Sequence, residues 1–209
     1  MIILLFVLAL CPMSSGQEIG QWGVSIQGDY SQPIAGLSDW FAAAPGLGIS
    51  LGQQRNEHWF IEARIEWARF DDENLTGYVA DHVELSLEHF GLVFNGRYQL
   101  GQLALLKPYL SLAGGLFRWR GIRGAVQADS TVSPYVPFIE EKKLEEQNWG
   151  FCSGIGAEVT LLPSLSLDVH AYYRFIIGDL WPTLQPNIEL EGVSGFQTVN
   201  VALALRYYF

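Results

Sequence analysis

The chain has 209 residues, of which 49% are hydrophobic and only 16% charged, and its formal net charge is −10. This acidic balance argues against a nucleic-acid-binding protein, because phosphates require a basic surface. No segment after the N-terminus reaches the roughly 18 consecutive apolar residues of a membrane-spanning helix. A chain with so many hydrophobic residues is expected to have either a tightly packed core or strands that face lipid. The aromatic share of 13% favours strands.

Residues 1–16 have the features of a secretory signal peptide. Residues 1–13 carry no charged side chain, and Ser14, Ser15 and Gly16 supply small residues that suit cleavage before the next residue. The basic residue that normally begins such a peptide is missing. We therefore predict an exported protein.

The predicted mature domain comprises residues 17–209. Cys11 would suit a lipoprotein signal, but Leu10 stands where those signals carry a small residue, so we do not expect lipidation. After cleavage only Cys152 remains of the two cysteines, which excludes an intramolecular disulfide.

Eight segments of this domain alternate between apolar and polar residues, the pattern of β-strands with two different faces. The pattern is clearest at 59–67, whereas the segment at 107–119 is apolar on both faces and its orientation is ambiguous, with Leu110, Leu112 and Leu116 on one side. We find no convincing amphipathic helix. The predicted strands are 21–30, 46–54, 59–67, 90–98, 107–119, 150–161, 165–175 and 198–209.

The connections between these strands alternate in length. Long polar connections at 31–45, 71–82, 120–148 and 178–195 follow the odd strands, and short ones at 55–58, 99–106 and 162–164 follow the even strands. This asymmetry is typical of transmembrane barrels, whose long loops are extracellular and whose short turns are periplasmic. It places both termini on the periplasmic side.

A barrel of nine or ten strands would need strands hidden within 121–147. The best candidate there is 132–139, which contains Pro134 and Pro137. Proline disfavours a paired strand because it lacks a backbone N–H. Eight strands are therefore expected.

Alternation alone does not say which face is outside. A soluble barrel with an apolar lumen, such as a lipocalin, is the alternative, and Gly20-Gln21-Trp22 matches the lipocalin G-x-W pattern weakly. Two features favour lipid outside: the apolar faces carry no charge, and the chain stops on a strand that ends in an aromatic residue.

Aromatic residues also bracket the apolar face. Trp59 and Trp67 lie eight residues apart on one face, as do Phe90 and Tyr98. At about 3.3 Å per residue and a strand tilt near 40°, this spacing spans about 20 Å, close to the apolar band of such barrels. The predicted aromatic girdle consists of Trp22, Trp59, Trp67, Phe90, Tyr98, Tyr173 and Phe175.

The sequence resembles the OmpA/OmpX-type outer-membrane β-barrel families. The resemblance rests on the signal peptide, the alternating strands, Pro108-Tyr109 followed by Gly114-Gly115, and the aromatic C-terminal strand. It implies an all-β fold, an eight-stranded antiparallel up-and-down transmembrane barrel in the bacterial outer membrane. It also implies that the last strand is the signal for the barrel-assembly machinery, assisted by periplasmic chaperones; the signal residues are Val201, Leu203, Leu205, Tyr207 and Phe209.

The faces opposite the apolar ones carry acids and bases in near balance, so the net charge belongs to loops, turns and strand ends. An eight-stranded barrel has an interior just wide enough for side chains, and buried charges there must pair. We predict a plug of ion pairs, with a narrow ion-conducting lumen as the alternative. Its members are Asp29, Glu62, Arg64, Glu66, Arg97, Glu158, Asp168, Arg174 and Arg206.

An enzymatic role has little support. His170 lies near Asp168, but the lipid A deacylases of this membrane need a Ser–His pair at the lipid-facing rim, and His170 faces inward in this register. His82 and His89 flank Ser86 where the alternation is broken. We predict no enzyme activity and no cofactor.

Two acidic segments remain. No His/Cys cluster suits a transition metal, and 71–73 (Asp-Asp-Glu) has the charge for a divalent cation but is more simply a solvated loop. Residues 140–146 have helix-forming composition and opposite charges at helical spacing, which suggests a helical turn. In all, the sequence predicts a monomeric barrel in outer-membrane lipid with a structural or adhesive role through its loops; a small-solute channel and a lipid-modifying enzyme are the second and third hypotheses.

Overall fold

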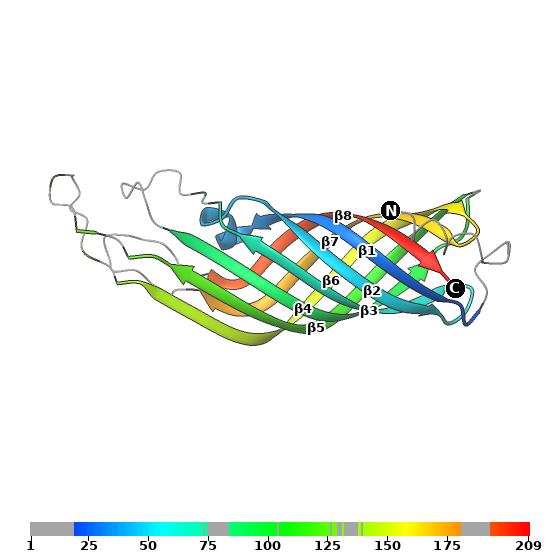
Figure 1. The fold of residues 1–209 in the computed structure, drawn as a ribbon, viewed down its shortest axis with the longest axis horizontal. Helices are drawn as coiled ribbons and strands as arrows, with labels where there is room; N and C mark the ends of the chain where they lie inside the picture. The colour runs from blue at the N-terminus through cyan, green and yellow to red at the C-terminus, as the bar shows by residue number, and fades with distance from the viewer. Residues whose placement is uncertain are drawn as a thin grey trace, which may run out of the picture.

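The computed structural model describes residues 19–72, 74, 84–103, 105–125, 127–128, 131, 138, 140–180 and 193–209. These residues form one closed barrel of eight strands, each antiparallel to its neighbours in sequence, with the last paired to the first (Figure 1). The predicted all-β class, strand number and up-and-down order are confirmed. The strands are β1 (Trp22–Ile34), β2 (Ala44–Gln54), β3 (Trp59–Phe70), β4 (Leu85–Gln99), β5 (Leu106–Arg123), β6 (Lys142–Leu162), β7 (Leu165–Leu180) and β8 (Val193–Tyr208).

Several predictions lie outside the described residues: the signal peptide at 1–16, His82, the third acid of 71–73 and most of 132–139. Within the described ranges, no helix has the length and hydropathy that a membrane-spanning helix needs.

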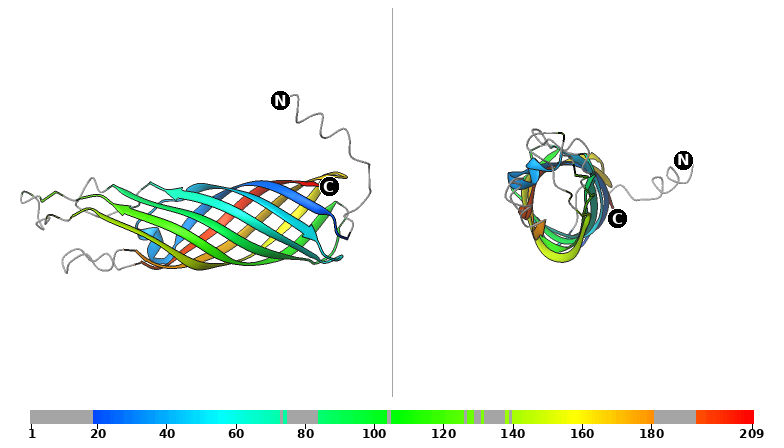
Figure 2. Two further views of the ribbon diagram at one scale, coloured as in Figure 1. Left: turned by 60° about the horizontal axis from the view of Figure 1, so that its bottom comes forward. Right: turned by 90° about the vertical axis from the view of Figure 1, so that its left-hand side faces the viewer.

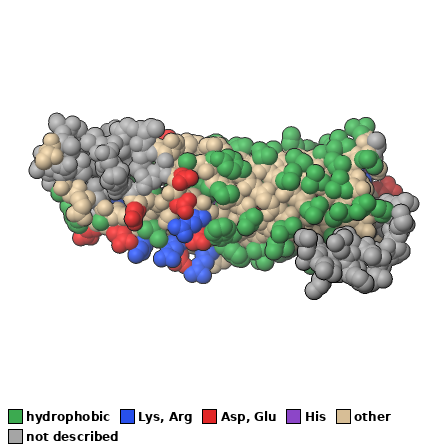
Figure 3. Space-filling model, turned by 45° about the horizontal axis from the view of Figure 1, so that its top comes forward, with side chains coloured by type: hydrophobic (Ala, Val, Ile, Leu, Met, Phe, Trp, Pro, Cys, Tyr) green, Lys and Arg blue, Asp and Glu red, His purple; other side chains and the backbone are tan. Residues whose placement is uncertain are grey.

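Side chains alternate between the lumen and the outside along most of each strand. On β3, Glu62 and Glu66 are buried, whereas Ile61 and Ile65 are about half exposed. On β5 the ambiguity is resolved, because Leu112 is 71% exposed and its strand neighbours point inward. On the face that Figure 3 shows, exposed aliphatic and aromatic side chains gather in a band, which we call the apolar belt. Its members include Val24, Ile26, Leu47, Ile49, Leu51, Ile61, Ile65, Leu92, Phe94, Leu110, Leu112, Phe151, Ile155, Val169, Val201, Leu203 and Leu205.

The barrel closes where β1 meets β8, and we call this junction the seam. Its register runs from Gly23 opposite Tyr208 to Ile34 opposite Gln197. At its end Trp22 N donates to Phe209 O at 3.1 Å and Phe209 N donates to Trp22 O at 2.9 Å. Closure satisfies backbone groups that an open edge would leave unpaired in hydrocarbon.

The two ends of the barrel differ. At the turn end, short turns join even to odd strands, and Gly20 N donates to Gln54 O at 2.7 Å. At the loop end, β4, β5 and β6 extend further than the other strands (Figures 1 and 2). The prediction of a helical turn at 140–146 is wrong, because β6 begins at Lys142 and pairs there with Arg123 of β5. Pairing with a neighbouring strand outweighs the local helical composition.

The predicted loop at 31–45 is also shorter than expected. β1 continues to Ile34, and a 3-10 helix, η1 (Ala35–Asp39), follows it. Leu37, Trp40 and Phe41 have almost no exposed surface, because they pack into the loop end of the lumen. There they join an apolar cluster whose other members include Phe70, Leu87, Phe117, Trp119, Ile176 and Phe196.

Rings make close contacts within this cluster. Phe41 lies 6.2 Å from Phe70 between ring centroids, and Trp119 meets Phe196 edge-to-face at 4.8 Å. The barrel is therefore filled by apolar side chains toward the loop end and by charged ones toward the turn end.

Candidate functional site in the barrel lumen

The structure places all nine side chains of the predicted ion network inside the barrel, each at most 7% exposed. They come from six strands, so residues far apart in sequence meet only because the barrel closes. Their ion pairs fall into two clusters along the barrel axis. The turn-end cluster contains Glu62, Arg97, Glu158, Asp168 and Arg206, and the mid-barrel cluster contains Asp29, Arg64, Glu66 and Arg174.

Glu62 is the centre of the turn-end cluster. Its Oε1 accepts hydrogen bonds from Arg97 Nη2 at 2.8 Å and Nε at 3.0 Å, and its Oε2 accepts one from Arg206 Nη2 at 2.7 Å. Arg97 also donates to Asp168, and Arg206 Nη1 lies 3.7 Å from Glu158 Oε2. Arg97 thus bridges two carboxylates and Arg206 three, since Arg206 Nη2 also lies 3.7 Å from Asp168 Oδ2. These pairs offset the cost of removing the charges from water.

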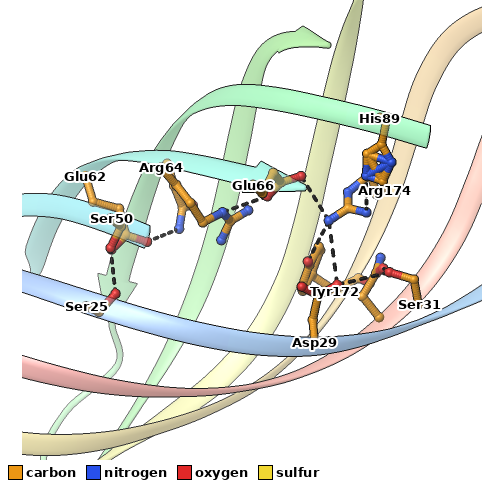
Figure 4. A network of polar contacts seen from close by, with 12 residues as sticks. Ser25, Asp29, Ser31, Ser50, Glu62, Arg64, Glu66, His89, Tyr172 and Arg174 are labelled. Carbon is orange, nitrogen blue, oxygen red and sulfur yellow. Dashed lines mark hydrogen bonds and ion pairs between the residues drawn. The ribbon is translucent and has the colours of Figure 1, made fainter. Parts of the chain in front are cut away.

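The mid-barrel cluster is organised by Arg174 (Figure 4). Its Nη2 lies 2.9 Å from Glu66 Oε1 and 3.9 Å from Asp29 Oδ2. Arg64 Nε donates to Glu66 Oε2 at 2.8 Å. Arg174 Nη1 also lies 3.1 Å from His89 Nε2. Two bases and two acids balance in this cluster.

Tyrosine hydroxyls, which the predicted ion network did not include, complete both clusters. Tyr109 donates to Asp168 Oδ1 at 2.6 Å, Tyr208 donates to Glu158 Oε2 at 2.7 Å, and Tyr172 accepts from Arg174 Nη2 at 2.8 Å. All three occupy the same alternate positions along their strands as the charged residues and therefore face the lumen. This position in the alternation is the sequence feature that could have identified them.

Some buried polar atoms have no hydrogen-bond partner among the described residues. They include both ring nitrogens of His170, Ser166 Oγ, Gln27 Nε2 and Asn95 Oδ1. His170 Nδ1 is 3.6 Å from Asp168 Oδ1, beyond hydrogen-bond length, and its ring stacks on Tyr172. Such atoms are the places at which buried water binds in proteins.

The lumen opens at the turn end into a cavity of about 820 Å³. Lys107 and Glu158, which face each other in the β5–β6 register, lie at its inner wall together with Tyr208. The cavity, the turn-end cluster and the mid-barrel cluster follow one another along the axis, and most of the large side chains of the apolar cluster lie beyond them toward the loop end.

No group of His, Cys, Asp or Glu within the described ranges has the arrangement of a metal site. Asp71 and Asp72 are exposed, and Asp71 Oδ2 lies 3.3 Å from Arg69 Nε. Cys152 is a free thiol buried in the lumen wall.

The predicted girdle residues all face outward. Trp59 and Tyr98 meet edge-to-face at 5.2 Å near the turn end, and Trp67 and Phe90 are paired across strands toward the loop end. Trp67 Nε1 donates to Glu88 Oε1 at 2.6 Å. The remaining girdle residues are Trp22, which is 44% exposed, Tyr173 at 37%, and Phe175, which is partly buried.

The predicted assembly-signal residues also face outward, on β8 and at the residue after it. Val201, Leu203, Leu205 and Phe209 are 44–59% exposed, and the Tyr207 ring stacks on that of Phe209 at 6.4 Å. They form one stripe beside the seam.

The model of the outer membrane protein beta-barrel domain family matches residues 2–209 of the sequence. Solved structures with similar folds include a major outer membrane protein from Thermus thermophilus, with a TM-score of 0.58, 11% identity, and coverage of 90% of this chain and 99% of that one. Neisserial surface protein A gives a TM-score of 0.55 and 15% identity, with coverage of 90% and 97%.

A third structure is Ail, the attachment invasion locus protein of Yersinia pestis, in complex with the heparin analogue sucrose octasulfate. Its TM-score is 0.52 at 11% identity, with coverage of 92% of this chain and 100% of that one. At such identities these likenesses concern the fold alone. Comparison with the curated proteins finds no match.

Proposed function

This chain belongs to the outer membrane protein beta-barrel domain family and is thus a small barrel of the bacterial outer membrane, and we propose that it has a closed lumen and acts through its loop end in a structural or adhesive role. The observation that carries the proposal is that both charged and apolar side chains fill the lumen. Two ion clusters and an apolar cluster lie in series along one axis. A pore would have to pass all three.

The loop end is the part that the proposal places outside the cell. It carries the long connections, and β4, β5 and β6 extend further there than the other strands, with charged side chains past the apolar belt (Figures 1 and 3). Among barrels of similar fold, Ail is named as an attachment protein. This precedent supports an adhesive role for a barrel of this size.

In planar bilayers, the refolded protein is expected to give no steady ion conductance, whereas a porin in the same bilayer conducts. The double variant Trp40→Ala/Phe41→Ala removes two large side chains from the apolar cluster and should remain closed, because both ion clusters still fill the lumen. If this variant conducts ions and the wild-type protein does not, the apolar cluster is what closes the lumen. A steady conductance of the wild-type protein would contradict the proposal.

A small-solute channel is the second candidate. The cavity of about 820 Å³ at the turn end and the unpartnered polar atoms behind it favour water entry from that side. The same conductance measurement distinguishes this candidate from a closed barrel. A lipid-modifying enzyme has less support, because His170 faces the lumen and not the lipid.

We further propose that the stripe on β8 is recognised by the barrel-assembly machinery, with periplasmic chaperones as earlier partners. Phe209→Ala should lower the amount of protein in the outer membrane and raise its degradation in the periplasm. Its unfolding midpoint after refolding in detergent should change little, because the Phe209 ring is 59% exposed and the backbone bonds to Trp22 are kept. Unchanged abundance would refute the signal, and a collapsed midpoint would assign Phe209 to packing.

A further inference from the structure

The cavity at the turn end has a charged inner wall that contains a lysine without an acidic partner. Lys107 of β5 and Glu158 of β6 lie opposite each other and are 8% and 3% exposed. Glu158 accepts hydrogen bonds from the Tyr208 hydroxyl at 2.7 and 2.9 Å, and its Oε2 lies 3.7 Å from Arg206 Nη1. Among the described residues, however, no carboxylate oxygen lies within 4.0 Å of the Lys107 ammonium. A largely buried cation of this kind favours binding of a group that can pair with it.

Two further buried side chains line the same cavity with a polar atom unused. Ser166 Oγ on β7 and Gln54 Oε1 on β2 have no hydrogen-bond partner within the described ranges, although these residues are only 1% and 2% exposed. Gln54 Nε2 is engaged, because it donates to Asn56 O at 2.6 Å. What is left is a hydroxyl that can donate and an amide oxygen that can only accept. A ligand that satisfies both needs an acceptor and a donor of its own.

The charges of the inner wall indicate a ligand without net charge. The turn-end cluster contains three carboxylates and two guanidinium groups, and Lys107 brings the number of bases to three. Acids and bases therefore balance before any ligand binds. A ligand with a net charge would leave one charge uncompensated in a largely buried site, whereas a zwitterion would not.

The distance across the wall limits the size of the zwitterion. Opposite residues of an antiparallel pair have Cα atoms about 4.5–5.5 Å apart, so the charges of Lys107 and Glu158 belong to neighbouring points of one wall. A ligand can meet both only if its own ammonium and carboxylate are close together. In an α-amino acid the two groups are attached to one carbon, whereas each added residue of a peptide moves them about 3.8 Å further apart.

The outer part of the cavity is apolar. Leu105, Leu161 and Leu162 line it and are 63%, 51% and 54% exposed, and we call them the leucine rim. Thr160 N donates to Leu105 O at 3.1 Å, so the β4–β5 and β6–β7 turns lie side by side at this point. Covering such exposed leucines with an apolar group is favourable. Small-molecule sites commonly combine apolar walls with a few polar groups in this way.

We propose that the turn-end cavity is a binding site for an apolar α-amino acid. The ligand carboxylate accepts hydrogen bonds from the Lys107 ammonium and the Ser166 hydroxyl. The ligand ammonium donates to Glu158 and to Gln54 Oε1, and the ligand side chain packs on the leucine rim. The cavity opens at the turn end, so the amino acid enters from the side that the topology predicts to be periplasmic.

The test measures binding of labelled L-leucine to the refolded protein in lipid nanodiscs by equilibrium dialysis, with empty nanodiscs as the blank. Binding should be saturable. Three unlabelled competitors each lack one feature of the ligand: 4-methylpentanoate has no ammonium, 3-methylbutylamine no carboxylate, and glycine no apolar side chain. Each should displace the label at least about tenfold less effectively than unlabelled leucine, since each loses a charged hydrogen bond or the apolar contact.

Two variants test the wall directly. Lys107→Met and Glu158→Gln each remove one charge at nearly constant size and should weaken leucine binding about tenfold or more. The matched controls are Lys142→Met and Glu146→Gln, which make the same changes at the loop end and should bind leucine like the wild-type protein. Gel migration before and after heating verifies that each variant is folded. The competitor series uses only the wild-type protein, so it tests the proposal even if a lumen variant does not fold.

Three results would each overturn the proposal: no saturable binding of leucine, a competitor as effective as leucine, or wild-type affinity in a folded Lys107→Met variant. An equally effective 4-methylpentanoate would assign the cavity to anionic amphiphiles instead. The conductance measurement concerns passage through the whole lumen and not this cavity, so the closed barrel and the amino-acid site fail independently.

Discussion

Replacing Glu62 by leucine is expected to lower the free energy of unfolding of the refolded barrel by about 3–5 kcal/mol, the usual cost of breaking a buried ion pair from one side. Glu62 is 1% exposed and accepts hydrogen bonds from Arg97 and Arg206 as well as from Ser50 Oγ and Asn95 Nδ2. Leucine would leave two guanidinium groups short of a carboxylate in the closed lumen. Urea unfolding of the protein in lipid vesicles measures the difference.

The matched control is Asp71→Ala, which removes an acid from an exposed ion pair with Arg69. Exposed pairs contribute about 0–1 kcal/mol, so this variant should unfold almost like wild type. The double variant Glu62→Leu/Arg206→Leu should recover part of the loss, because one of the two stranded charges is then gone. A Glu62→Leu variant as stable as the Asp71→Ala variant would show that the turn-end cluster contributes no net stability.

Replacing Gly115 by valine is expected to cost more than the roughly 1–3 kcal/mol typical of overpacking a core. Gly115 lies opposite Val93 in the β4–β5 register, and a Cβ there would meet Leu92 O and approach Val93 Cα at 2.7 Å. These are backbone atoms of the paired strand, so no change of rotamer relieves the clash. The folded fraction, read from heat-sensitive gel migration after refolding, should fall steeply.

The adjacent Gly114 supplies the control, because it points outward and the nearest atom to a Cβ there is Phe151 Cδ1 at 3.7 Å. Gly114→Ala should therefore refold like wild type. Equal behaviour of the two variants would mean that β4 and β5 separate enough at this point to admit a side chain.

Local alternation was sufficient to predict the number and order of the strands and, except on β5, the direction of their side chains, but not where β1 ends or where β6 begins. The alternation of residues along a strand, odd positions against even ones, is enough to separate Trp59 and Ile61, which are exposed, from Phe60 and Glu62, which are buried. Parity is a property of neighbouring residues and needs no knowledge of the partner strand, which is why it can be read from one sequence.

Partners could not be predicted in the same way. Arg206 and Glu62 are 144 residues apart and meet because of strand stagger and barrel closure, neither of which appears in the local pattern. The loop end was harder still. Leu37, Trp40 and Phe41 sit in a segment that looked like a polar loop, although three large apolar residues there were a sign that it packs inward.

The seam between β1 and β8 has a kinetic consequence. It joins β1 to β8 and, beyond them, Trp22 to Phe209, so the bonds that close the barrel form between segments about as distant in sequence as the barrel allows. Contacts this distant in sequence form slowly, since the entropy of closing the chain into a loop must be overcome first. Until the final strand arrives, the outer faces of the other seven are exposed to water and prone to aggregate. We therefore propose that the arrival of β8, the strand that also carries the proposed assembly signal, sets the time for which an exported chain would have to be held soluble.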